Sequence, residues 1–133
     1  MNKFSRTSAA RLATCHPDLQ KVITKALEVC DCSILCGHRS KEEQNALFLE
    51  GKSQLQYPNG KHNTLPSRAV DVAPYPIDWN DRERFSYFAG VVIGVGASMG
   101  VAIRWGGDWD SDFDLKDNAF DDLMHFELID DNA

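Results

Sequence analysis

The sequence has no long, uninterrupted apolar run. Its longest uncharged stretch, residues 85–103, contains four glycines and two serines, and these dilute the hydrophobicity that a membrane-spanning helix needs. The chain begins MNKFSRTSAARLATCHPDL, which holds no apolar core of signal-peptide length. We therefore expect neither membrane insertion nor export through a signal peptide.

The sequence also has no internal repeat and no low-complexity tract, which excludes repeat architectures and fibrous proteins. Its 133 residues are the length of one domain. Hydrophobic residues make up 43% of the chain and charged residues 26%, which are ordinary values for a globular protein. We expect one folded domain over residues 1–133.

Basic residues are scarce, above all near the end of the chain. There are 14 Lys and Arg against 20 Asp and Glu, and the net charge is −6. Residues 1–105 carry +3, whereas residues 106–133 carry −9 and contain Lys116 as their single base. This balance excludes a nucleic-acid binder, because phosphate neutralisation needs a basic surface. The acidic segment needs an explanation of its own.

Paired cysteines of the C-x2-C type are absent. The four cysteines lie at positions 15, 30, 32 and 36, and the C-x-C-x3-C spacing lacks the paired knuckles of common zinc modules. Without an export signal, disulfides are not expected. We predict reduced thiols that pack as small hydrophobic residues.

Apolar periodicity and capping signals predict three helices and four short strands. The helices are expected at residues 17–29, 41–50 and 81–99. The strands are expected at residues 33–36, 69–73, 102–105 and 125–128. In the second strand, Val70 and Val72 face one way and Asp71 faces the other. The mixed order favours an α+β fold, with the helices packed on a short, mostly antiparallel sheet.

One group of residues has the composition of a metal site. Asp71 is costly within an apolar strand unless it is paired or metal-bound, and His62 precedes it by nine residues. His125 begins a neighbouring strand, three residues after Asp122. Two imidazoles and one carboxylate leave a coordination position open for water, as in catalytic zinc sites. There is no H-E-x-x-H motif, so from spacing alone a solvated histidine and a turn-capping aspartate remain the alternative interpretation.

Three separated blocks of sequence carry a family resemblance. They are GKHNTLPSRAVDVAPYPIDWND, RWGGDWD and DDLMHFEL, and they occur in this order. Together they resemble the short phage endolysins among the VanY-type zinc D,D-/L,D-peptidases, over about residues 17–129. Those endolysins are L-alanyl-D-glutamate peptidases that cut bacterial peptidoglycan.

The resemblance implies a role for five residues. The family motif S-x-H-x-x-G-x-A-x-D places His62 and Asp71 as ligands of one zinc ion. The D/E-x-x-H element makes His125 the third ligand and Asp122 the catalytic base. Arg39, in GHRSKEEQ, matches the arginine that supports the polarised carbonyl.

The resemblance also points to Gln44 and Trp109 as substrate contacts, because the family pattern leads to the first and the WGGDWD block borders the active site. The sequence departs from the motif in two respects. The interval from His62 to Asp71 is nine residues rather than seven, and Ser67 stands where the family usually has glycine.

Alternating carboxylates occupy the acidic segment, in the order D-W-D-S-D-F-D. Asp108, Asp110 and Asp112 fall at positions 1, 3 and 5 of a calcium loop. Phe113 stands at the sixth position, where an EF-hand needs glycine. The segment is therefore not an EF-hand. A looser calcium site at these three aspartates and a solvated acidic loop are both compatible with the pattern.

The leading interpretation is a zinc-dependent peptidoglycan peptidase for host lysis, with one catalytic domain and no separate cell-wall-binding domain. We expect a monomer that stays in the host cytoplasm until it is released to the cell wall. A D-alanyl-D-alanine carboxypeptidase is the alternative within the same fold. A non-enzymatic metal- or calcium-binding module and a cysteine hydrolase using Cys15 or Cys36 are the alternatives from other classes.

Overall fold

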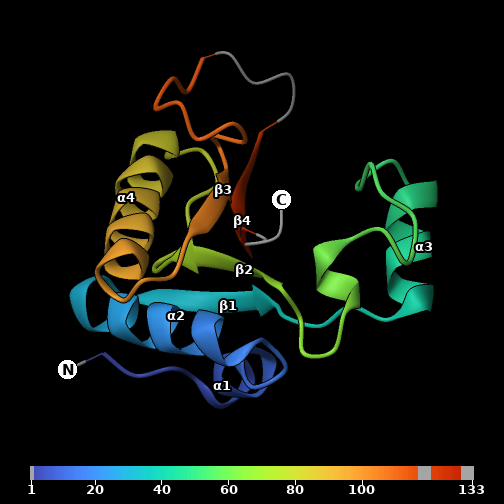
Figure 1. Ribbon diagram of the computed structural model, residues 1–133, viewed down its shortest axis with the longest axis horizontal. Helices are drawn as coiled ribbons and strands as arrows, with labels where there is room; N and C mark the ends of the chain where they lie inside the picture. The colour runs from blue at the N-terminus through green and yellow to red at the C-terminus, as the bar shows by residue number, and fades with distance from the viewer. Residues whose placement is uncertain (1, 117–120, 130–133) are drawn as a thin grey trace.

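The structure, a computed structural model, describes residues 2–116 and 121–129. The described residues form helices, one 3-10 turn and strands with the following bounds: α1 Arg6–Leu12, α2 Pro17–Val29, β1 Cys32–Cys36, α3 Lys41–Leu49, η1 Lys61–Asn63, β2 Ala69–Pro74, α4 Arg82–Ser98, β3 Ile103–Gly106 and β4 Asp122–Leu128. Figure 1 shows α4 beside β3 at one side of the sheet, and α1 and α2 along β1.

The four strands form one sheet in the order β1-β2-β4-β3. All three neighbouring pairs are antiparallel. This confirms the predicted α+β fold with an antiparallel sheet. Because β2 and β4 are adjacent although α4 and β3 lie between them in the sequence, the middle of the sheet joins residues more than fifty positions apart. Asp71 pairs directly with His125 there.

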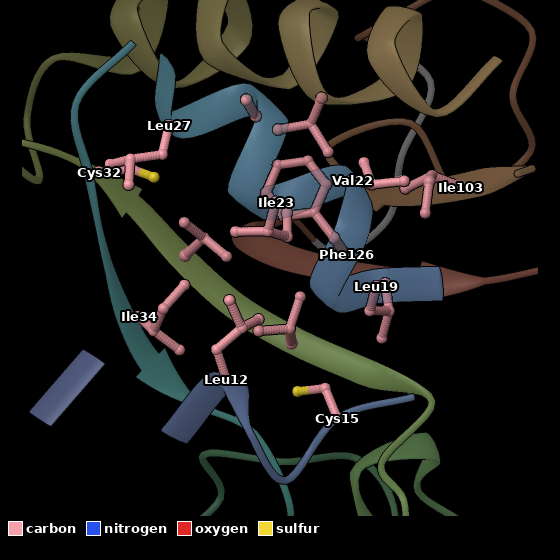
Figure 2. Packing of buried hydrophobic residues seen from close by; sticks show 14 of the residues in the cluster. Leu12, Cys15, Leu19, Val22, Ile23, Leu27, Cys32, Ile34, Ile103 and Phe126 are labelled. Atoms are coloured by element: carbon pink, nitrogen blue, oxygen red, sulfur yellow. The ribbon is translucent and has the colours of Figure 1, made fainter. Parts of the chain in front are cut away.

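The two faces of the sheet have different chemistry. Val70, Val72 and Phe126 belong to the buried hydrophobic core, which α2 and α4 cover. Figure 2 shows Val22 and Ile23 of α2 above Phe126. Since side chains alternate along a strand, the residues between these core positions point to the opposite face. That face carries the polar residues of the middle strands.

Local sequence accounts for the helix boundaries. Pro17 begins α2, and the side chain of His16 accepts a hydrogen bond from the backbone of Asp18. Ser40 and Glu43 form a reciprocal capping box at the start of α3, as their spacing predicts. Asp81 caps α4 through the backbone N–H of Arg84. The three predicted helices are thus confirmed to within a residue or two of their ends.

Two elements differ from the sequence prediction. The described residues contain a fourth α-helix, α1, which is capped by Ser5 and is only seven residues long. A helix of two turns is too short to show a periodic apolar face, and tertiary contacts with β1 hold it. The second difference is that β4 begins at Asp122 rather than His125, so the predicted base and the predicted third ligand share one strand.

Helix α3 stands apart from the sheet in Figure 1, with the loop that follows it alongside. The chain passes from β1 out to α3 and returns through η1 to the start of β2. This connection between β1 and β2, called the α3 excursion below, lies next to the polar face of the sheet. Among the described residues, no helix has both the length and the apolar content needed to cross a lipid bilayer.

Candidate metal centre and active-site cleft

A cleft of about 780 Å³ lies between the α3 excursion and the polar face of the sheet. Its lining includes the predicted ligands, the predicted base and the predicted arginine: Arg39, His62, Asp71, Asp122 and His125. Trp109 and Gln44 line it as well. The structure therefore brings all seven residues named from the family resemblance to one cavity, although they come from five different segments of the chain.

His62 lies in η1 and is held from both sides of its ring. Its Nδ1 lies 2.7 Å from the carbonyl oxygen of Gly37 and its Nε2 lies 3.1 Å from Asp71 Oδ1. A carbonyl oxygen can only accept, so Nδ1 carries the proton in this hydrogen bond. Gly37 is fixed in turn, because any side chain there would collide with Thr14 and the backbone of Arg11.

His125 lies on β4 and reaches the same oxygen of Asp71. Its Nδ1 is 3.4 Å from Asp71 Oδ1, and its Nε2 is 2.8 Å from Glu127 Oε1. Burial alone would raise the pKa of Glu127, but the hydrogen bond and positive charge of His125 and the neighbouring Lys61 hold it below its ordinary value. An ionised carboxylate only accepts, so Nε2 donates. In the neutral form of His125 the lone pair therefore lies on Nδ1, toward Asp71.

His62 Nε2 and His125 Nδ1 both face Asp71 Oδ1, and the centroids of the two imidazole rings lie 5.1 Å apart. Two donor atoms that each lie about 2.0–2.1 Å from a tetrahedral zinc ion are about 3.3 Å from each other. The observed separations from Asp71 Oδ1 are 3.1 Å and 3.4 Å. Both histidines also have their second ring nitrogen bound to an acceptor, which is the usual arrangement around zinc ligands. The donor set fits a zinc ion.

Without a metal, a proton must lie between these acceptors. Burial alone would lower the pKa of His62, but the charge and hydrogen bond of Asp71 raise it to about 10. Burial would likewise lower the pKa of His125, yet its bonds to Asp71 and Glu127 raise it. Burial opposes ionisation of Asp71, but the two histidines lower its pKa below the ordinary value. The site therefore attracts cations strongly.

Cys36 also belongs to this site, although the sequence suggested it only as an alternative nucleophile and not as a neighbour of the predicted metal ligands. A donor atom each from Cys36, His62 and Asp71 all lie within 4.8 Å of one another. The pairing of β1 with β2 is irregular between Ile34 and Cys36, and this irregularity sets Cys36 opposite Asp71. Local spacing gives no sign of that register. The thiol adds a soft donor beside His62 and Asp71.

Arg39 and Gln44 form a second group in the cleft wall. One Arg39 nitrogen lies 3.3 Å from Asp71 Oδ2, and the other donates to Gln44 Oε1 at 3.0 Å. Gln44 is only 1% exposed. Its amide nitrogen donates to the hydroxyl of Ser53 and to the carbonyl oxygen of Leu55. Gln44 therefore links α3, the following loop and the guanidinium group.

Asp122 lies at the start of β4 and lines the cleft with the predicted metal ligands. Burial raises its pKa, and the negative charge of Asp71 raises it further, against the opposing effect of His125. Residues three apart on a regular strand face opposite sides, but the pairing of β3 with β4 is irregular between Trp105 and Gly106. The irregularity brings Asp122 and His125 to the same cleft. The ring of Trp109 lies 5.4 Å from that of His125.

The acidic loop is ordered by its own carboxylates. Asp108, which is 7% exposed, accepts hydrogen bonds from the backbone of Asp112 and Phe113. Oxygen atoms of Asp108, Asp110 and Asp112 all lie within 4.8 Å of one another. Desolvation and the neighbouring carboxylates of Asp112 and Asp108 raise the pKa of Asp110, against the lowering effect of a hydrogen bond with the Asp112 backbone. The three predicted aspartates are therefore gathered in one place.

The structure argues against Cys15 as a nucleophile. Its side chain is 1% exposed and belongs to the hydrophobic core, where Figure 2 shows it beside Leu12. Burial raises the pKa of this thiol to about 12. Because the thiolate is the reactive form, Cys15 has no accessible nucleophilic state at neutral pH.

The sequence and the fold are similar to known peptidases. The family described as phage L-alanyl-D-glutamate peptidase matches residues 1–129. The L-alanyl-D-glutamate peptidase of Escherichia phage T5 is 36% identical over 135 residues, which cover 96% of this chain and 98% of that protein. The crystal structure of the Serratia marcescens L-Ala D-Glu endopeptidase ChiX superposes with a TM-score of 0.76 at 28% identity. That match covers 96% of this chain and 91% of the other.

Proposed function

This chain belongs to the phage L-alanyl-D-glutamate peptidase family, and from that premise we propose that it is a zinc-dependent peptidoglycan peptidase. Its substrate is the stem peptide of the bacterial cell wall, and the bond cleaved joins L-alanine to D-glutamate. The observation that supports the proposal best is the convergence of His62, Asp71 and His125 at the base of a cleft that Asp122 also lines.

His62, Asp71 and His125 would hold the zinc ion through Nε2, Oδ1 and Nδ1. A zinc ion held there would polarise the scissile carbonyl and acidify a water molecule. Asp122 accepts the proton of that water and then delivers it to the leaving amine. Its raised pKa suits both steps, because a base whose pKa lies closer to the working pH exchanges protons more readily.

Arg39 stabilises the negative charge that develops on the carbonyl oxygen, since a fixed cation in a partly enclosed cleft is worth more than in water. Gln44 holds the guanidinium from behind, so it contributes to substrate binding by positioning Arg39. Trp109 offers an aromatic surface next to His125 for the substrate. Cys36 stays close to the ligands and raises the preference of the site for soft metals.

Removal and restoration of the metal tests this proposal. Purified peptidoglycan is incubated with the protein as isolated, after treatment with a chelator, and after re-addition of zinc. We expect release of new amino groups to stop with the chelator and to return with zinc. Asp122→Asn should remain inactive after zinc is restored. Loss of activity on thiol alkylation, with no effect of the chelator, would instead support a cysteine hydrolase acting through Cys36.

The products separate the proposal from its alternatives. A D-alanyl-D-alanine carboxypeptidase would release free D-alanine and no new amino terminus within the stem. A non-enzymatic metal-binding module would release neither product, and Arg39 and Asp122 would be dispensable for its metal binding. The proposed peptidase and the non-enzymatic module both release no D-alanine, but only the peptidase creates a new D-glutamate amine.

We further propose that the acidic loop binds a calcium ion through Asp108, Asp110 and Asp112. Three carboxylates within 4.8 Å of one another repel each other unless a cation offsets their charge. Calcium should raise the thermal unfolding temperature of the wild-type protein and leave that of Asp110→Asn less affected. A calcium titration that changes neither stability nor activity would remove this part of the proposal.

The same reasoning extends to the setting in which the protein acts. We propose a monomeric endolysin that stays in the host cytoplasm until it reaches the cell wall. Light scattering of the eluted protein tests the monomer. Host cells are fractionated before lysis and again after its onset, which tests whether the protein stays in the cytoplasm until lysis. A stable dimer, or protein found outside the cytoplasm before lysis, would contradict it.

A further inference from the structure

Glu127 occupies a position that the proposed reaction does not use. It is a buried carboxylate, 7% exposed, on the polar face of the sheet. It follows His125 by two residues, so both side chains point to the same face of β4. A buried acidic group is unfavourable unless its charge is matched. The groups that contact the Glu127 carboxylate therefore indicate its role.

Both oxygens of the carboxylate are engaged. Oε1 accepts the Nε2–H hydrogen bond of His125 at 2.8 Å. Oε2 lies 3.1 Å from Lys61 Nζ and 3.5 Å from a terminal nitrogen of Arg104. Arg104 is the direct cross-strand neighbour of Glu127. The two cations fix the carboxylate on the side away from the histidine.

Lys61 connects this carboxylate to the opposite ligand. It immediately precedes His62 in η1, and its ammonium group also donates to the carbonyl oxygen of Leu128 at 2.7 Å. The contacts of Lys61 with Glu127 and Leu128 join the segment that carries one histidine ligand to the strand that carries the other. Backbone hydrogen bonds from Arg68 to Lys61 and from Arg39 to His62 also hold η1, and the Lys61 side chain adds a direct connection from η1 to β4.

We propose that Glu127 is a positioning residue for His125, and that its ion pair with Lys61 sets the spacing of the two histidine ligands. Glu127 accepts a hydrogen bond from Nε2–H, so the proton stays on Nε2 and the Nδ1 lone pair stays directed at the metal. Lys61 holds Glu127 and η1 together. The inference rests on the proposed zinc site, and it assigns no contact between Glu127 and substrate.

Zinc affinity measures this role without reference to catalysis. The zinc dissociation constant is determined by competition with a chromogenic chelator for the wild type, Glu127→Ala and Glu127→Gln. Loss of such an outer partner usually weakens metal binding about 10–100-fold, and we expect this for Glu127→Ala. Glu127→Gln keeps a carbonyl acceptor for Nε2 and should recover part of the loss. Glu28→Ala, which removes an exposed ion pair with Lys25, is the control and should bind as the wild type does.

Lys61→Met tests the second half of the inference. It removes the ion pair but leaves the His125–Glu127 hydrogen bond, so its zinc affinity should lie between those of the wild type and Glu127→Ala. It also serves if Glu127→Ala fails to fold, which thermal unfolding of the metal-free variants reveals. Nitrogen-15 NMR of the His125 ring adds a direct signature: the Nε2-protonated form should dominate in zinc-loaded wild type and lose its dominance in zinc-loaded Glu127→Ala.

The outcomes separate this inference from the function on which it rests. A wild-type protein that does not bind zinc would overturn the proposed function. Wild-type binding together with unchanged affinity in both Glu127→Ala and Lys61→Met would overturn the positioning role alone. Equal losses in Glu127→Ala and Glu127→Gln, with an unaltered ring tautomer in both, would also overturn it, because the hydrogen bond would then be irrelevant.

Discussion

Zinc binding to this protein should release the protons that His62 and His125 carry in the metal-free state. In the metal-free protein, the Asp71 carboxylate raises the pKa of His62 to about 10. At pH 7.5, which is about 2.5 below that value, about 99% of His62 side chains carry a proton on Nε2. Zinc needs the same lone pair. Each zinc ion bound should therefore displace about one proton from His62.

His125 adds to this number. Its pKa is also raised, and its Nδ1 faces the same carboxylate oxygen. We expect a total of one to two protons released at pH 7.5. The logarithm of the zinc association constant should rise with pH by about one to two per pH unit until His62 loses its proton. Displacing the His62 proton at pH 7.5 costs about 3 kcal/mol, at about 1.36 kcal/mol for each pH unit below the pKa.

Calorimetry in two buffers with different ionisation enthalpies measures the released protons directly. His38→Gln is a matched control, because His38 is a half-buried histidine that does not line the cleft, and the proton count of this variant should equal that of the wild type. No proton release at pH 7.5, together with a zinc affinity that does not change between pH 6.5 and 9, would refute the reasoning. It would mean that the histidine lone pairs do not share a cation with Asp71.

Three further predictions follow from the same contacts. Asp122→Asn should lower kcat about 10²–10⁴-fold, the usual contribution of a general acid–base group, while chelator competition shows zinc affinity within about twofold of wild type. Gln44→Leu should leave the partners of the amide unsatisfied and lower the free energy of unfolding in urea by about 1–3 kcal/mol, with a loss of kcat/KM because Arg39 loses its support. Urea unfolding of the metal-free protein should show a stability contribution from His62 that is complete below pH 6.5 and disappears as pH rises toward 10. Asp71, whose pKa is lowered, should contribute stability above pH 3.8 that is lost in more acid solution. A metal-free protein whose stability does not fall between pH 6.5 and 10 would contradict the assignment of His62.

Much of the fold could be predicted because its signals are local. The capping box at Ser40 and the apolar spacing after Pro17 fix helix starts within a few residues of sequence. The alternation of Val70, Asp71 and Val72 assigned the faces of β2 correctly. Helix α1 was missed because seven residues carry too little periodicity, and its stability comes from packing on β1.

The parts of the site that could not be predicted depend on strand register. Cys36 lies 35 residues before Asp71, and only the irregular pairing of β1 with β2 sets them opposite each other. Glu127 belongs to the block that carries the family resemblance, yet its role depends on Lys61, 66 residues earlier. The burial of Gln44 follows from the path of the loop after α3. Residue spacing within one segment cannot predict these contacts, because each of them joins residues from different segments.

Identification of the amino terminus created in purified peptidoglycan tests the central claim most directly. The digest is made with zinc-loaded protein and with the same protein after chelation, and the products are sequenced by mass spectrometry. The proposed function predicts a new D-glutamate amine in the zinc-loaded digest and none in the chelated one. Free D-alanine without a D-glutamate amine, or the same products in both digests, would contradict it.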